Sequence, residues 1–247
     1  DWTISLAIFS TLIYVVAIIF VLPFLKQFIR LIERIVPEEG DDLTKYLDES
    51  VASIAPVAIE ATRRTLVKVM KNTLNVAVEY SETRELTQKM KQQLSTGQSA
   101  LVETRKFLSK VNEKSYSKGE EEYNKQISLV HAIDHINRLL RALLDAEQMK
   151  KDFDTEVDQL FKEVIELFKS FDTELTYDRN EPFVEKLAEE SKRIAEIRRE
   201  YRKVMLESSV LDQKDVDDAI EKVHTLHWID RLVYHVWRGT FHINQGI

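Results

Sequence analysis

The amino-acid sequence predicts an all-α protein with one membrane-spanning helix, and three observations support this prediction. The 247 residues include only five Gly and four Pro, whereas Ala, Leu, Glu, Lys and Arg, which favour helices, are abundant. No charged side chain occurs in residues 2–25. The rest of the chain carries apolar side chains at helical spacing in a series of segments. We therefore expect helices throughout and no sheet.

Composition and charge exclude several functions. The formal net charge is −7, whereas proteins that bind nucleic acid normally carry a basic excess. The chain has no cysteine, so it has neither disulfides nor a thiolate metal site. It shows no Gly-rich phosphate loop and no recognisable nucleophile motif. We expect neither an enzyme nor a nucleic-acid-binding protein, and we expect no cofactor.

The N-terminal apolar segment is long enough to cross a bilayer. Its 24 residues, 2–25, would extend roughly 36 Å as a helix, more than the ~30 Å hydrocarbon core requires. A signal peptide would instead place its charges before a shorter apolar region. Here Lys26, Arg30 and Arg34 follow the segment, which predicts a plasma (inner) membrane protein with its C-terminus in the cytoplasm. These three side chains share one helix face and are expected to contact lipid headgroups.

The remaining residues divide into a linker and six amphipathic helices. We assign residues 1–36 to the transmembrane helix with its basic extension, and residues 37–54, with Pro37 and an acidic run, to the linker. The predicted helices cover about 56–80, 83–111, 120–149, 152–175, 183–207 and 214–243. Helices of this length suit two three-helix bundles in tandem within residues 55–247, one over about 55–149 and the other over about 150–247.

Three segments resemble one protein family. Residues 227–238 read HWIDRLVYHVWR and resemble the closing WLDR-x-x-YH-x-WR signature of bacterial sodium/phosphate cotransporter proteins that carry a C-terminal PhoU-like domain. Residues 21–37 (VLPFL, then LIERIVP) resemble the last transmembrane helix of that family, and residues 55–64 (APVAIEATRR) the start of its cytoplasmic domain. The resemblance therefore covers essentially the whole chain in order.

The resemblance implies a regulatory role. The complete protein would carry phosphate with sodium, and this portion would be its final membrane helix and PhoU-like regulatory domain. The polar QSSS-type repeats of the family lie on earlier membrane helices and are missing here, and Tyr14 stands where the family tends to carry Asn. Because the chain begins with Asp1, we expect a piece of a longer protein. Its partners would be the lipid bilayer and the missing transport helices, and a homodimer is left open.

The metal clusters of PhoU-like domains are not expected here. The four positions that carry their acidic ligands are Asn137, Arg141, Asp230 and Tyr234 in this sequence, so one carboxylate remains, and hard cations need several oxygen ligands. Two alternatives stay open beside the symporter tail. One is a free-standing membrane-anchored PhoU-like adaptor that docks on another transporter or a kinase. The other is a helical metal-binding module.

Histidines are the weak candidates for such a metal. His131 and His135 are four residues apart, a spacing at which two imidazoles can chelate one ion. The alternative is that both are solvated or face a partner.

The last helix carries the stronger candidate site. Its basic residues recur at spacings of three and four, which places them on one stripe of an otherwise apolar helix: His224, His227, Arg231, His235, Arg238 and His242. The stripe could pair with carboxylates such as Glu185, Glu189 and Glu190. Alternatively, Arg231 and Arg238 bind an anion (phosphate, a phosphorylated partner or lipid headgroups), and the histidines strengthen binding as pH falls toward about 6. Asp230 is expected to form a structural ion pair with Arg231 rather than to act as a base.

Overall fold

The computed structural model describes two compact units, Asp1–Asp42 and Leu43–Ile247, to different extents. In the first unit it describes only Trp2, Phe9, Leu12 and Tyr14, which are helical and exposed. In the second it describes residues 43–111, 116, 118–174, 180–207 and 213–246.

The predicted transmembrane span thus lies outside the described residues, apart from these four positions, as do Lys26, Arg30, Arg34 and the start of the predicted linker. Among the helices that are described, none is both long and apolar enough to cross a membrane.

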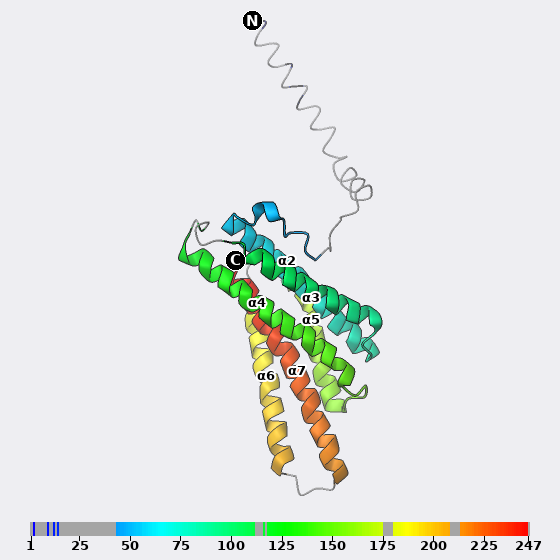
Figure 1. Cartoon of the computed structure of the whole chain (residues 1–247). Helices are drawn as coiled ribbons and strands as arrows, with labels where there is room; N and C mark the ends of the chain where they lie inside the picture. Colours follow the sequence, from blue (N-terminus) through cyan, green and yellow to red (C-terminus); the bar gives the residue numbers. More distant parts are fainter. Residues whose placement is uncertain are drawn as a thin grey trace. The chain divides into compact units, whose positions relative to one another are not determined.

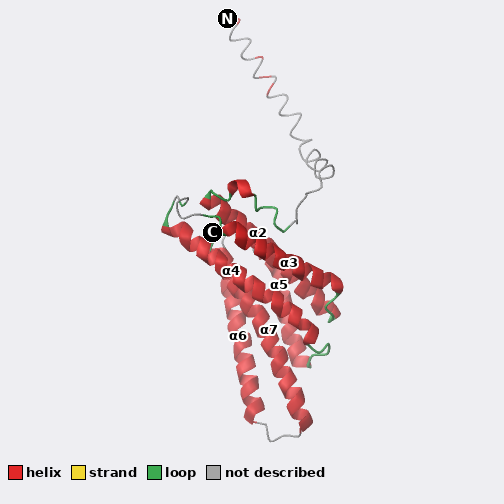
Figure 2. Ribbon diagram, viewed as in Figure 1, coloured by secondary structure: helices red, strands yellow, loops and turns green. Residues whose placement is uncertain are grey.

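The described part of the chain is all-helical and contains no strand (Figures 1 and 2), which confirms the predicted fold class. The six long helices of the second unit are α2 (Ala55–Thr83), α3 (Gln88–Leu108), α4 (Glu120–Leu144), α5 (Thr155–Glu174), α6 (Glu181–Glu207) and α7 (Gln213–Gln245). Two short 3-10 helices, η1 (Glu49–Val51) and η3 (Asp145–Gln148), precede α2 and follow α4. The division of this unit into two bundles near residue 150 stays a prediction.

The largest boundary difference lies between α2 and α3, where the second predicted helix began at residue 83. Arg84 takes a left-handed conformation (φ 52°) and its N–H donates to the carbonyl of Tyr80, which ends α2. Thr87 then caps α3, because its hydroxyl accepts a hydrogen bond from the N–H of Met90 at 3.2 Å. Because Arg84 ends α2 and Thr87 caps α3, the second helix begins at Gln88 rather than at about residue 83.

An aromatic cluster joins four of the helices at the centre of the core. The ring centroid of Trp228 on α7 lies 5.7 Å from that of Tyr80 on α2 and 5.3 Å from that of Phe161 on α5. The indole N–H of Trp228 donates to the carbonyl of Ala142 on α4 at 2.7 Å. All three rings are almost fully buried. This arrangement gives the indole both apolar contact and a hydrogen-bond partner, as a buried Trp requires.

The C-terminal half of α7 lies close against α2 and α4 (Figure 1). A Cβ atom on Gly239 would lie 2.6 Å from Cε of Met70, and one on Gly246 would lie 2.8 Å from Cδ2 of Leu129. Glycine at these two positions therefore permits the close approach.

Replacing Trp228 by Phe is expected to lower the free energy of unfolding by about 2 kcal/mol, because a cavity forms and the Ala142 carbonyl loses its donor. Urea denaturation of the full chain, followed by far-UV circular dichroism, measures the change. Val102→Ala, at an exposed position of α3, is the control and should cost about 0.5 kcal/mol or less. Equal losses in the two variants would contradict a central role for Trp228.

Candidate anion-binding site

The predicted basic stripe of α7 separates into three settings in the structure. Its first two histidines face α6, its central arginine pairs with the end of α4, and its last residues face the body of α4. In the central setting, Nη1 of Arg231 lies 2.9 Å from Oδ2 of Asp145. The carboxylate partner is thus Asp145 of η3 and not one of the three α6 glutamates that the sequence suggested. Arg231 is held by this ion pair and does not join Arg238 in one anion site.

A basic pocket lies between α6 and α7. It has a volume of about 260 Å³ and is lined by Arg198, Arg199, Arg202, Val223, His224 and His227. Among the residues that the structure describes, no carboxylate lines it. Guanidinium groups remain charged at every physiological pH. The pocket therefore presents concentrated positive charge to any ligand that enters it.

Arg198 is fixed in this pocket by two neighbours on α7. Its Nε lies 3.1 Å from Oδ2 of Asp230, and its Nη1 lies 3.1 Å from Nδ1 of His227. Asp230 therefore pairs with Arg198 across the helices, whereas the sequence suggested the adjacent Arg231. Because a guanidinium can only donate, Nδ1 of His227 accepts, and the ring proton is on Nε2.

The remaining groups of the pocket are less constrained. Nε of Arg199 donates to the carbonyl of Ala195 at 3.0 Å, and Arg202 and His224 are exposed. Partial burial lowers the pKa of the His227 imidazole, and the nearby charges of Arg198 and Arg231 lower it further. Burial raises the pKa of the Asp230 carboxyl. At neutral pH the pocket thus combines three guanidinium charges with a neutral imidazole that can donate from Nε2.

Sequence reasoning missed the three arginines of α6. They occur in the segment IRREYRK, which mixes four basic residues with one glutamate and reads as an ordinary solvated helix surface. The available signal was the four-residue spacing of Arg198 and Arg202, which places both on one face. This spacing indicates a shared pocket only when it is known that α6 packs beside α7.

The last part of the stripe belongs to a second group, which we call the histidine cluster: His131 and His135 on α4, and His235 and His242 on α7. Nδ1 of His135 lies 3.2 Å from Nδ1 of His235. The ring of His242 stacks on those of His131 and His135, with centroids 5.0 Å and 5.7 Å apart. Nδ1 of His242 lies 3.1 Å from Oγ of Ser128, and its Nε2 lies 3.1 Å from Nη2 of Arg238.

Burial makes three of these imidazoles, those of His135, His235 and His242, hard to protonate. It lowers the pKa of both His235 and His242 to about 4, with smaller contributions from neighbouring imidazoles and from Arg238 at His242. The pKa of His135 is lowered for the same reason. His235 and His242 are therefore neutral near pH 6, so they do not add the charge that the sequence analysis expected of them there.

The metal chelate of His131 and His135 stays a prediction. The rings of His131 and His135 both stack on His242, and Nδ1 of His135 also contacts His235. In the part of the chain that the structure describes, no three potential ligands are arranged to hold a metal ion.

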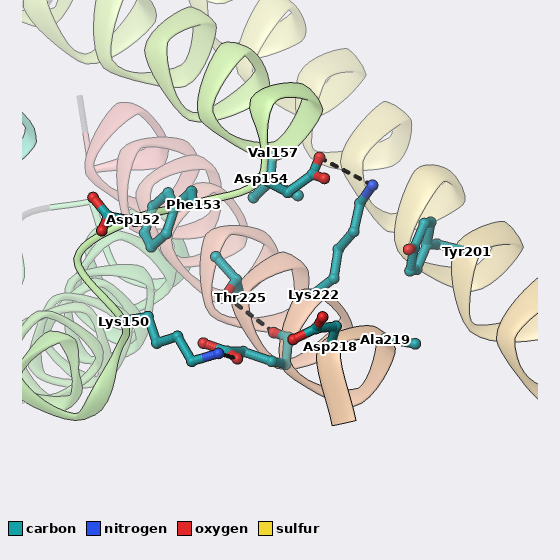
Figure 3. Close-up of a pocket in the computed structure, with 11 residues that line it drawn as sticks. Lys150, Asp152, Phe153, Asp154, Val157, Tyr201, Asp218, Ala219, Lys222 and Thr225 are labelled. Carbon is teal, nitrogen blue, oxygen red and sulfur yellow. Dashed lines mark hydrogen bonds and ion pairs between the residues drawn. The ribbon is translucent and has the colours of Figure 1, made fainter. Parts of the chain in front are cut away.

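A larger pocket of about 370 Å³ lies on another side of α7 (Figure 3) and has mixed charge. Nζ of Lys222 lies 3.1 Å from Oδ1 of Asp154 and 2.9 Å from Oε2 of Glu156. Lys150 pairs with Glu221. Since its cations already have carboxylate partners, this pocket favours an anion less than the basic pocket does.

Comparisons with protein-family models, curated proteins and solved structures found no match.

Replacing Arg198 by Gln is expected to raise the pKa of His227 toward 6.5, because a positive charge next to the ring is removed. An NMR titration of the imidazole resonances measures this pKa. Arg105→Gln, at an exposed position of α3, should leave it unchanged. A His227 pKa that stays the same in Arg198→Gln would contradict the described contact.

Proposed function

We propose that this chain is the final membrane helix and regulatory cytoplasmic domain of a sodium-dependent phosphate transport protein, and that its basic pocket binds phosphate. The observation that carries the proposal is the pocket between α6 and α7, with three guanidinium groups and no lining carboxylate among the described residues. The resemblance of residues 227–238 and 55–64 to the sodium/phosphate cotransporter family supports the assignment to phosphate transport.

The donors of the pocket suit a tetrahedral oxyanion. Guanidinium groups bind phosphate oxygens through two parallel hydrogen bonds, and these are stronger than bonds between neutral groups. Arg198 is held in place by Asp230 and His227. Arg199 and Arg202 lie one turn apart at the accessible side, where they can close on a bound ion. Among the ion pairs between described residues, the one that involves these arginines joins Arg198 to Asp230.

Phosphate in this pocket would link α6 to α7. The ligand would contact arginines of α6 and histidines of α7, so binding stabilises the paired arrangement of the two helices. In α7 the pocket residue His227 directly precedes Trp228, the centre of the aromatic cluster. A change in the α6–α7 pairing can therefore reach the packed core through one helix.

The membrane part of the proposal rests on the sequence. Residues 2–25 would cross the inner membrane, with Lys26, Arg30 and Arg34 at the cytoplasmic headgroups. Residues 26–36 would pass helix movements of the regulatory domain to the transport helices of the same protein. The chain would thus control transport and catalyse no reaction.

The full chain in neutral, lipid-free detergent at neutral pH should bind inorganic phosphate in isothermal titration calorimetry. Arg199→Gln and Arg202→Gln should each weaken binding about tenfold, since each removes a charged hydrogen-bond donor. Arg105→Gln is the matched control with the same charge change elsewhere. If millimolar phosphate produces no heat of binding and no rise in melting temperature, phosphate is ruled out as the ligand. Because phospholipid is absent, a headgroup cannot produce the signal.

A cysteine added after Ile247 should not react with a membrane-impermeant maleimide in intact cells, because the basic residues after the span retain the C-terminus inside. The chain has no other cysteine, so the readout is specific. Labelling after the cells are permeabilised is the positive control. Strong labelling of intact cells would contradict the proposed orientation.

A further inference from the structure

The histidine cluster lies in the contact between α4 and the C-terminal half of α7. The two helices run antiparallel there, as three contacts along their length show: Trp228 with Ala142, His235 with His135, and His242 with Ser128. The same stretches of α4 and α7 also carry the buried Ile133, Ile136 and Val236. Any event that separates these imidazoles therefore acts on the packing of two core helices.

The contacts of the cluster limit the number of protons that its imidazoles can hold. The two Nδ1 atoms of His135 and His235 can share one proton, but a proton on each would place two N–H groups 3.2 Å apart. Nε2 of His242 faces a guanidinium N–H of Arg238 and must accept from it, so Nδ1 of His242 carries the proton and donates to Ser128. A further proton on His242 would oppose both the N–H and the charge of Arg238.

The charged groups around the cluster offer little compensation for added protons. On α4 the carboxylate that acts on it is Asp134, which pairs with Arg138 at 2.8 Å. On α7, Arg238 adds positive charge and Arg231 is paired with Asp145.

In the part of the chain that the structure describes, the other contacts made here involve uncharged groups. Tyr234 contributes its ring to His135 and His235, and α2 contributes the apolar Met70 next to Gly239. The described polar contacts of α6 with α7 lie elsewhere, from Arg198 to His227 and Asp230. Just before α6, Asn180 contacts Asn244. Protonation would thus leave excess positive charge inside the interface.

We propose that the histidine cluster is a proton-binding regulatory site: the contacts of its His135, His235 and His242 imidazoles hold the C-terminal half of α7 against α4, and protonation of these three rings releases it. This site is independent of the basic pocket, which lies on the α6 side of α7 and involves other residues.

The pH range follows from the protonation of the two states. In the closed state the pKa of His235 and of His242 is about 4, and in a solvated, open state it returns to the ordinary value of 6.5. Between these values the open state binds more protons, so the closed state loses stability as pH falls from 6.5 toward 4. Above 6.5 both states carry neutral imidazoles, and these groups add no further pH dependence.

Equilibrium unfolding of the full chain tests the site. Between about pH 7.5 and about pH 5, protonation of His235 and of His242 should each lower the folding equilibrium constant about tenfold. This is less than the full difference between the closed-state and open-state pKa values implies, because both rings keep some contact with solvent. The double variant His235→Asn/His242→Asn keeps polar side chains at both positions. Its folding equilibrium constant should fall about a hundredfold less than that of the wild type over the same pH range, because both tenfold contributions are removed. His224→Asn, exposed and outside the cluster, should keep the dependence of the wild type. An unchanged dependence in the double variant would overturn the proposal.

A second measurement uses the wild-type histidines and does not require the double variant to fold. Val130 on α4 and Gln245 on α7 are exposed, so cysteines there can carry spin labels in this otherwise cysteine-free chain. The distance between the labels should increase between about pH 7.5 and about pH 5. An unchanged distance, together with His235 and His242 imidazole resonances that titrate near 6.5, would overturn the proposal.

Discussion

The packing of α7 against α4 is the contact on which the rest of the structure depends. Trp228 inserts into the core from α7, contacts Tyr80 and Phe161, and donates its indole proton to α4. Burial of such aromatic side chains supplies several kcal/mol each relative to truncation. The absence of a side chain at Gly239 and Gly246 lets the helices approach closely. Because α7 also packs against α6, its position on α4 determines where both groups of histidines lie.

One sequence stripe therefore becomes two sites. A stripe with spacings of three and four stays on one side of a helix, but the neighbouring helices change along its length. His224 and His227 meet the arginines of α6, whereas His235 and His242 meet the histidines of α4. Arg231 lies between these regions and pairs with Asp145. The first group meets accessible positive charge. In the second, His135, His235 and His242 are at least partly buried and have lowered pKa values, so the two groups suit different ligands, an oxyanion and a proton.

The sequence predicted the helices well and their partners poorly. Hydrophobic periodicity indicates which face of a helix is buried, and it located all six helices of the second unit. It does not indicate which helix covers that face, so the partners of Arg231 and Asp230 were wrong and the arginines of α6 were missed. The α2–α3 boundary also shifted, since the left-handed residue is Arg84, where Gly or Asn is the usual signal. The lowered pKa values arise from burial between helices, which no single segment encodes.

Hydrogen–deuterium exchange of the full chain, with and without inorganic phosphate, is the most direct measurement of how α7 connects its ligand to the core. If phosphate joins α6 to α7, amide exchange should slow in residues 195–207 and 213–230 and should change little in α3. If amide exchange is the same with and without phosphate, or slows only in other helices, the result would contradict a phosphate-binding α6–α7 pair.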